Sequence, residues 1–176
     1  SIDTTRVGMM GHSFGSVTAG FAAQEDTRIR AVLGIAAPME SPLLPGVSIA
    51  KIDKPLFLFI AEEDNSITSI GNRLLRDNFD AAVNEAWKVE IADAGHWSFS
   101  NLTGLTDMFM PGCGRDKRMT NGDDFTYLDP AIGKQIGSAY ATAFFLNALT
   151  ETEGAAEFLD ATPIWEVVSS ESRNAP

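Results

Sequence analysis

Residues 6–16 read RVGMMGHSFGS, in which a short apolar run ends directly in a G-x-S-x-G pattern around Ser13. This pattern is typical of a sharp turn from a β-strand into an α-helix, with the serine at the corner. Gly11 and Gly15 let strand and helix approach closely, while the corner residue takes a strained backbone. We predict that Ser13 exposes its hydroxyl at the carboxyl end of a strand, as a candidate nucleophile. The alternative is an ordinary Gly/Ser turn.

The chain has two histidines, His12 and His96, that could act as a base beside this serine. Neighbouring side chains in a strand point apart, so His12 cannot easily meet Ser13. His96 lies in the sequence AGHW, shortly after the alternating stretch WKVEI, which predicts a strand. A histidine in the loop after a strand fits the serine, acid, histidine order of hydrolase elbows. A partly buried histidine that caps a loop is the alternative.

An acidic partner should lie between the serine and the histidine in the sequence. The strongest strand pattern, PLFLFIA, ends directly in EEDN. Asp64 is the preferred acid because it can turn toward the histidine loop, whereas Glu62 and Glu63 should complete the strand end or face solvent. Asp93 is the reserve candidate, since an acid so close to the histidine in sequence more often makes a hydrogen bond within the loop. The acid would fix the imidazole tautomer and stabilise its charged form.

These motifs resemble the carboxyl-terminal half of an α/β-hydrolase. The chain is most similar to the branch that holds dienelactone hydrolase-like proteins, platelet-activating-factor acetylhydrolases, and bacterial cutinases and polyester hydrolases. The similarity rests on DTTRV leading into GHSFG, on FIAEED and on AGH, and extends over about residues 1–160. It implies an α/β fold with a mostly parallel sheet flanked by helices, in which Ser13, Asp64 and His96 are nucleophile, acid and base. Ser16 departs from the pattern, because many relatives have glycine there.

The resemblance also implies an oxyanion hole made of two backbone N–H groups. Phe14, directly after the serine, is the expected first donor. The second donor comes in this superfamily from a loop much earlier in the chain, and Ser13 stands close to the start of this sequence. We therefore expect an amino-terminal segment of the same hydrolase, missing here or bound as a separate chain, to complete the site.

The pattern of the sequence also predicts the main elements. Four strands are expected, at residues 6–10, 29–36, 56–61 and 87–92. Three helices are expected, at residues 15–24, 67–83 and 131–149. The last helix has a predicted packing face of residues spaced by four, Ile132, Ile136, Tyr140 and Phe144. Four strands make about half of a hydrolase sheet and would leave one edge of the serine-bearing strand unpaired, which also favours an additional amino-terminal segment.

Residues 101–129 carry Gly, Asp, Asn and Pro without sustained periodicity. They are expected to form a long loop excursion after the histidine, typical of a lid or a pocket wall. We expect one catalytic half-domain over residues 1–160 and a carboxyl-terminal tail over residues 161–176 that frays from Val168 onward.

The composition, with 44% hydrophobic and 21% charged residues, is that of a globular domain with a core. The net charge of −11 argues against nucleic acid and anionic lipid headgroups as partners, although it also serves solubility alone. No apolar run reaches the roughly 18 residues of a membrane-spanning helix. Neither a cofactor nor a metal is expected, because two distant histidines and one cysteine make a poor ligand set.

Cys113 is the single cysteine and cannot form a disulfide within this chain. It is either a free thiol or the partner of a cysteine in the amino-terminal segment. The second case would imply an oxidising compartment, secreted or periplasmic, so the localisation stays open.

Apolar side chains near the serine predict an acyl or aromatic pocket, with Met39, Trp97 and Phe99 as substrate contacts. Loop packing is an equal alternative for Met39 and Phe99. The function we predict is hydrolysis of a small-molecule or lipid-like carboxylic ester through an acyl-enzyme. A lipid acetyl-ester or polyester hydrolase, a peptidase or amidase, and a non-catalytic hydrolase-like binding module are the alternatives.

Overall fold

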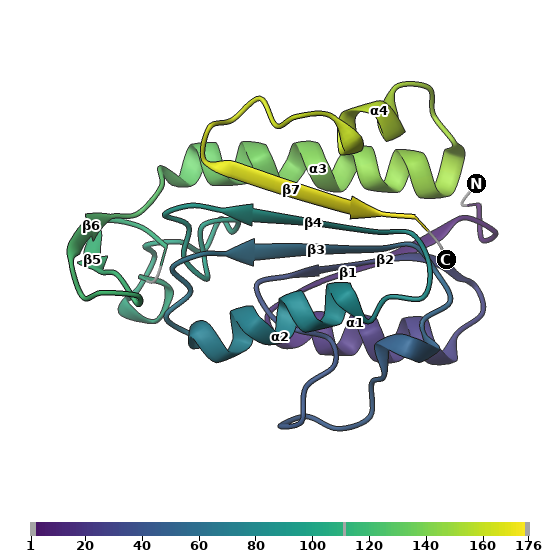
Figure 1. Cartoon of the computed structure of the whole chain (residues 1–176), viewed down its shortest axis with the longest axis horizontal. Helices are drawn as coiled ribbons and strands as arrows, with labels where there is room; N and C mark the ends of the chain where they lie inside the picture. Colours follow the sequence, from purple (N-terminus) through teal and green to yellow (C-terminus); the bar gives the residue numbers. More distant parts are fainter. Residues whose placement is uncertain (1–2, 111, 175–176) are drawn as a thin grey trace.

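The computed structural model describes residues 3–110 and 112–174. Figure 1 shows a central sheet with helices on both faces. Its five strands, in the order β1-β2-β3-β4-β7, span Val7–His12, Ile29–Ile35, Leu56–Ala61, Ala86–Ile91 and Val168–Arg173. β1 to β4 run parallel, and β7 pairs antiparallel with β4. The predicted α/β fold with a mostly parallel sheet is confirmed, and the four predicted strands are β1 to β4.

Helices cover both faces of the sheet (Figure 1). α1 (Phe14–Glu25) and α2 (Thr68–Asp80) cover one face, and α3 (Pro130–Thr150) and α4 (Ala155–Asp160) cover the other. α1, α2 and α3 are the three predicted helices. α4 was not predicted, because its six residues are too few to show a helical period in the sequence. Within the described ranges, none of the helices is both long and apolar enough to cross a bilayer.

β3 is buried along its whole length and divides the core in two. Phe57 and Phe59 point to the face covered by α3, where both rings pack against Tyr140. Leu58 and Ile60 point to the opposite face, into the cluster formed with α1 and α2. A parallel strand covered by helices on both sides is apolar at every position, which explains why this stretch of sequence does not alternate.

α3 begins at a helix start that the sequence encodes. Asp129 is the N-cap, and its Oδ1 accepts a hydrogen bond from the N–H of Ala131 at 2.8 Å. Pro130 occupies the first helical position, where an N–H has no partner within the helix. Three of the four residues of the predicted packing face are buried, and the first of them, Ile132, is exposed. The packing face is therefore confirmed from the second turn of α3 onward.

The expectation of a tail that frays from Val168 onward is wrong. This segment forms β7, which pairs with β4 over its full length. A salt bridge of 2.9 Å between Lys88 of β4 and Glu171 of β7 reinforces the pairing. The sequence of β7, VSSESR, is polar because an edge strand has a solvent-exposed side, so it lacks the apolar pattern that predicts a strand. The sheet therefore extends beyond residue 160.

Residues 101–129 contain short regular elements instead of a plain loop. β5 (Arg115–Lys117) and β6 (Asp124–Thr126) pair as an antiparallel hairpin. One 3₁₀ turn, η2 (Asp107–Phe109), also lies in this segment, and another, η1 (Ile49–Lys51), precedes β3. Elements of three residues are too short to leave a periodic signal in the sequence.

We expect Phe57→Ala to lower the free energy of unfolding by about 3 to 5 kcal/mol, because it opens a cavity between β3 and α3. Phe21→Ala is the matched control: Phe21 lies on α1 with 53% of its surface exposed, and its loss should cost about 1 kcal/mol or less. Urea titration of both variants measures the difference. Equal losses would contradict the assignment of the core to both faces of β3.

Candidate active site

Ser13 stands at the turn between β1 and α1, with φ of 56° and ψ of −127°. Such a backbone is strained for a residue with a side chain and persists only where the surroundings hold it. The N–H of Ser13 donates to the carbonyl of Ile35 in β2 at 2.9 Å. A Cβ on Gly11 would lie 1.9 Å from the carbonyl oxygen of Gly15, so only glycine fits there. This is the predicted strand-to-helix corner.

Asp64 and His96 are joined by a buried hydrogen bond. His96 Nδ1 lies 2.8 Å from Asp64 Oδ2, and the two residues are 3% and 0% exposed. The other carboxylate oxygen of Asp64 accepts from the backbone N–H groups of Ser66 and Ile67. These bonds fix the carboxylate in one orientation. The imidazole therefore donates from Nδ1 and leaves Nε2 unprotonated when the ring is neutral.

His12 connects the end of β1 to the histidine loop. Its Nε2 donates to the backbone carbonyl of His96 at 2.7 Å, and the two rings lie 4.7 Å apart. Burial lowers the pKa of His12, which favours the neutral ring. The sequence analysis excluded His12 as the base but did not anticipate this structural role. The contact brings the histidine loop beside the corner that carries Ser13.

In the described part of the chain, Ser13 Oγ makes no hydrogen bond with the His96 ring. Catalytic hydrogen bonds are often long or poorly aligned without substrate and tighten in the complex. Three features nevertheless lie at this end of the sheet. They are the strained backbone at Ser13, the hydrogen bond between Asp64 and His96, and the hydrogen bond from the His12 ring to the carbonyl of His96. Ser13, Asp64 and His96 therefore remain the candidate site residues, and the structure brings all three to this end of the sheet.

The other carboxylates near this site point elsewhere. Glu62 is exposed, as expected, but Glu63 is 1% exposed and bonds to Arg118, so the expectation that Glu63 faces solvent or completes the strand end is wrong. Asp93, the reserve acid, also pairs with Arg118, at 2.6 Å. Among the neighbouring acids, Asp64 is the one that contacts the histidine ring.

The predicted substrate contacts divide into two groups. Trp97 lies beside both histidines, with its ring centre 4.8 Å from that of His12 and 5.1 Å from that of His96, while Phe14, the expected oxyanion donor, is 67% exposed beside Ser13. Phe99 packs against Phe59 in the core. Met39 is fully buried and would meet a Cβ added at Gly20 or Gly34, so its side chain fills the space under α1.

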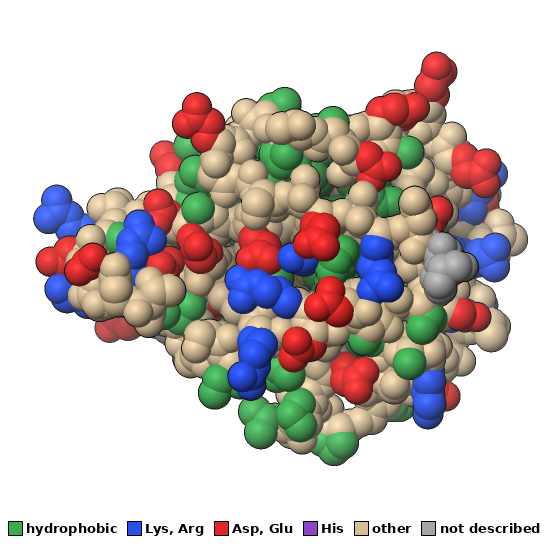
Figure 2. All heavy atoms as spheres, viewed as in Figure 1, with side chains coloured by type: hydrophobic (Ala, Val, Ile, Leu, Met, Phe, Trp, Pro, Cys, Tyr) green, Lys and Arg blue, Asp and Glu red, His purple; other side chains and the backbone are tan. Residues whose placement is uncertain are grey.

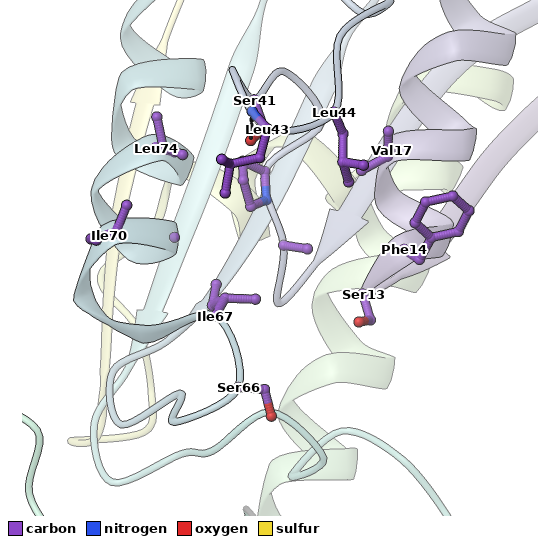
Figure 3. A pocket seen from close by; sticks show the side chains of 13 residues that line it. Ser13, Phe14, Val17, Ser41, Leu43, Leu44, Ser66, Ile67, Ile70 and Leu74 are labelled. Carbon is purple, nitrogen blue, oxygen red and sulfur yellow. Dashed lines mark hydrogen bonds between the residues drawn. The ribbon is translucent and has the colours of Figure 1, made fainter.

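A cavity of about 340 Å³ opens beside Ser13. Figure 3 shows the serine at its edge, with Leu43 and Leu44 of the loop after β2 near Val17 of α1, and with Ile67 and Leu74 on the side of α2. Sequence reasoning did not find these apolar residues. The sequence feature that could have indicated them is SPLLPG, in which two leucines stand between prolines. This stretch lies between the second and third predicted strands.

The surface around the cavity is apolar, whereas the sheet edge is charged. Figure 2 shows hydrophobic side chains gathered where the loop after β2 protrudes in Figure 1, and acidic and basic side chains intermixed near the middle of the face. Leu43 at the tip of that loop is 81% exposed. The apolar rim favours ligands with an apolar part.

A family model described as platelet-activating factor acetylhydrolase, isoform II, matches residues 1–110. The match covers more than half of the chain and includes Ser13, Asp64 and His96. The chain therefore belongs to this family of the α/β-hydrolase superfamily, as the resemblance predicted. Family membership implies hydrolase activity on esters. No curated protein matches the chain.

Gly11→Ala should destabilise the corner severely, because the new Cβ would overlap the backbone of Gly15. We expect a loss of about 3 kcal/mol or more in the free energy of unfolding, or failure to fold. Gly15→Ala is the matched control from the same motif: nothing lies within 4 Å of its added Cβ, so the fold should tolerate it. Thermal unfolding of both variants measures the contrast, and equal tolerance would contradict the geometry of the corner.

Proposed function

We propose that this protein hydrolyses carboxylic esters through an acyl-enzyme, with Ser13 as nucleophile, His96 as general base and Asp64 as the acid that orients it. The buried hydrogen bond between His96 Nδ1 and Asp64 Oδ2 carries the proposal. It selects the tautomer whose Nε2 can accept a proton. Membership in the acetylhydrolase family supports an ester as the substrate.

In the proposed acylation, His96 Nε2 takes the hydroxyl proton while Ser13 Oγ attacks the ester carbonyl carbon. The buried carboxylate of Asp64 stabilises the imidazolium that forms. The N–H of Phe14, at the start of α1, donates to the oxyanion. The imidazolium returns its proton to the leaving alcohol. A water molecule, deprotonated by His96, then attacks the acyl carbon, the bond to Ser13 Oγ breaks, and the imidazolium returns the proton to Ser13 as the acid leaves.

The apolar cavity favours a lipid-like ester over a polar substrate. Its lining places side chains of α1, α2 and the loop after β2 within reach of the serine. Such a cavity can receive an acyl chain, although each methylene changes the binding free energy by only about 1 to 3 kcal/mol. We therefore propose a lipid acetyl ester or a related apolar ester as substrate, with polyesters, amides and a purely binding role as alternatives.

The edge of β1 supports a further partner. In the described residues β1 pairs with β2 alone, and Met10 is 51% exposed beside a groove of about 460 Å³ along α3. An edge with unpaired N–H and C=O groups readily accepts another strand. We propose that an amino-terminal segment of the same hydrolase pairs here and brings the second oxyanion donor. The catalytic half-domain would then comprise residues 1–160 together with β7.

Ser13→Ala should reduce kcat/KM for p-nitrophenyl acetate by about 10⁴-fold or more, and Asp64→Asn by about 10⁴-fold. The carboxamide still reaches the ring but stabilises the wrong tautomer. Steady-state kinetics in the full chain measures both losses. Ser66→Ala removes another of the serine hydroxyls that line the cavity and should keep more than about a tenth of the activity.

Asp77→Asn is the matched control for the acid, because Asp77 lies exposed on α2 away from the histidine. It should leave kcat/KM within about twofold of the wild type. A large loss in Ser66→Ala with activity left in Ser13→Ala would contradict the assignment of the nucleophile. Hydrolysis of amides but not of esters would favour the peptidase alternative.

Leu74→Trp should fill part of the cavity and select against long acyl groups. We expect kcat/KM for p-nitrophenyl octanoate to fall about 10-fold or more, while the value for the acetate changes by less than about threefold. Val83→Trp is the control, because Val83 is 41% exposed and lies outside the cavity lining. It should leave kcat/KM for both esters unchanged. An equal loss on both esters would place the acyl group elsewhere.

A further inference from the structure

Glu63 is a buried carboxylate that the proposed reaction does not use. It stands directly before Asp64 in the chain and is 1% exposed. Its Oε2 accepts from the N–H of Met119 at 2.8 Å, and its Oε1 accepts from Arg118 Nη1 at 3.1 Å. A carboxylate is rarely buried without a charged partner, because desolvation disfavours its ionised form.

Arg118 also reaches the loop that carries the histidine. Its Nη2 lies 2.6 Å from Oδ1 of Asp93, three residues before His96. The hydrogen bonds to Asp93 and Glu63 raise the pKa of the guanidinium. The planar guanidinium also lies 4.8 Å from the ring centre of Phe125, a residue of β6. One side chain therefore bridges the loop after β3 and the loop after β4.

The arginine is itself held by a closed hairpin. Its N–H donates to the carbonyl of Asp123, and its carbonyl accepts from the N–H of Gly122. The hairpin of β5 and β6 lies at the same end of the sheet as the loops after β3 and β4 (Figure 1). The two loops also meet directly, since the N–H of Glu63 donates to the carbonyl of Ala94 at 2.9 Å.

We propose that Arg118 is a positioning residue for the Asp64–His96 pair: it clamps both loops through Glu63 and Asp93 and balances the buried charge of Glu63. This role rests on the proposed function. The excursion after the histidine is then a part of the catalytic assembly rather than a lid or a pocket wall. Arginine suits the position because its fork can bond two carboxylates at once.

The charges around the histidine determine the sign of the expected effect. His96 faces Asp64 from the loop after β3 and His12 from β1. The next groups outward are Glu63, Asp93 and Arg118. The formal charges of these three residues sum to one negative charge. Beyond them, Asp116 and Tyr127 are bonded to Asn65, and burial raises the pKa of Tyr127.

Arg118→Gln adds net negative charge near the histidine, and this favours the protonated imidazole, which cannot act as a base. The acid limb of the pH profile of kcat/KM should therefore move to higher pH, by about half a unit or more. Glu63→Gln removes a negative charge and should move the same limb to lower pH by a similar amount. The double variant should return to within about 0.2 units of the wild type.

The measurement is kcat/KM for p-nitrophenyl acetate in the full chain, from about pH 5 to about pH 9. Arg118→Lys keeps the positive charge and should keep the midpoint, although it loses the bidentate geometry. Lys117→Gln removes one exposed positive charge from the same hairpin and should leave the midpoint unchanged. If Arg118→Gln does not fold, a downward shift in Glu63→Gln with none in Arg118→Lys is the supporting result.

Shifts in the same direction for Arg118→Gln and Glu63→Gln, or no shift in either, would overturn the role of Arg118. A purely structural hairpin would lower the rate in both variants without opposing shifts. If the wild-type protein, assembled with its amino-terminal segment, hydrolyses no ester at any pH, the proposed function fails before the variants are compared. If it hydrolyses the ester and the midpoints do not diverge, only the inference about Arg118 fails.

Discussion

The hydrogen bond from His96 Nδ1 to Asp64 Oδ2 joins two loops that leave adjacent parallel strands, β3 and β4. Parallel strands end at the same edge of a sheet, so side chains that are distant in sequence meet there. The corner at Ser13 reaches this edge from β1, because β2 lies between β1 and β3 and all four strands run parallel. The site therefore depends on the strand order, in which the fully buried β3 lies at the centre of the sheet.

Asp64 and Glu63 are both buried, but they differ in their hydrogen-bond partners. Asp64 is enclosed and receives backbone N–H groups on one oxygen and the imidazole on the other. Glu63, its neighbour, is equally enclosed but turns to the hairpin. Both residues lie in the turn that follows β3, where Asp64 turns to the histidine and Glu63 to the N–H of Met119, so two adjacent carboxylates are buried without sharing a partner. Each is stabilised by its own donors.

Much of the sheet could be predicted because its signals are local. The strands β1 to β4 and the helices α1, α2 and α3 all carry apolar runs or caps, and the corner at Ser13 has its own glycines. β7 could not be predicted, since its polar side chains suit an exposed edge and its pairing with β4 is a long-range contact. The hairpin of β5 and β6 could not be predicted for another reason, because strands of three residues leave no periodic signal in the sequence.

The candidate site was predictable where chemistry limits the choice. Two histidines leave one candidate base after His12 is excluded by strand geometry, and the structure bonds this candidate, His96, to an acid that follows the central strand. The apolar cavity was not predictable from sequence, because Leu43 and Leu44 acquire their role only when the loop after β2 folds against α1 and α2. Met39 has the same hydrophobic character but lies in the core, a difference that hydrophobicity alone cannot reveal.

The most direct test of the central claim is covalent labelling of the natively folded protein with a fluorophosphonate, followed by intact-mass analysis and peptide mapping. The account predicts one adduct per chain, on Ser13, because only a serine activated by a neighbouring base attacks the phosphorus rapidly. An adduct on Ser66, or no adduct in a protein that is folded, would contradict the assignment of Ser13 as the nucleophile.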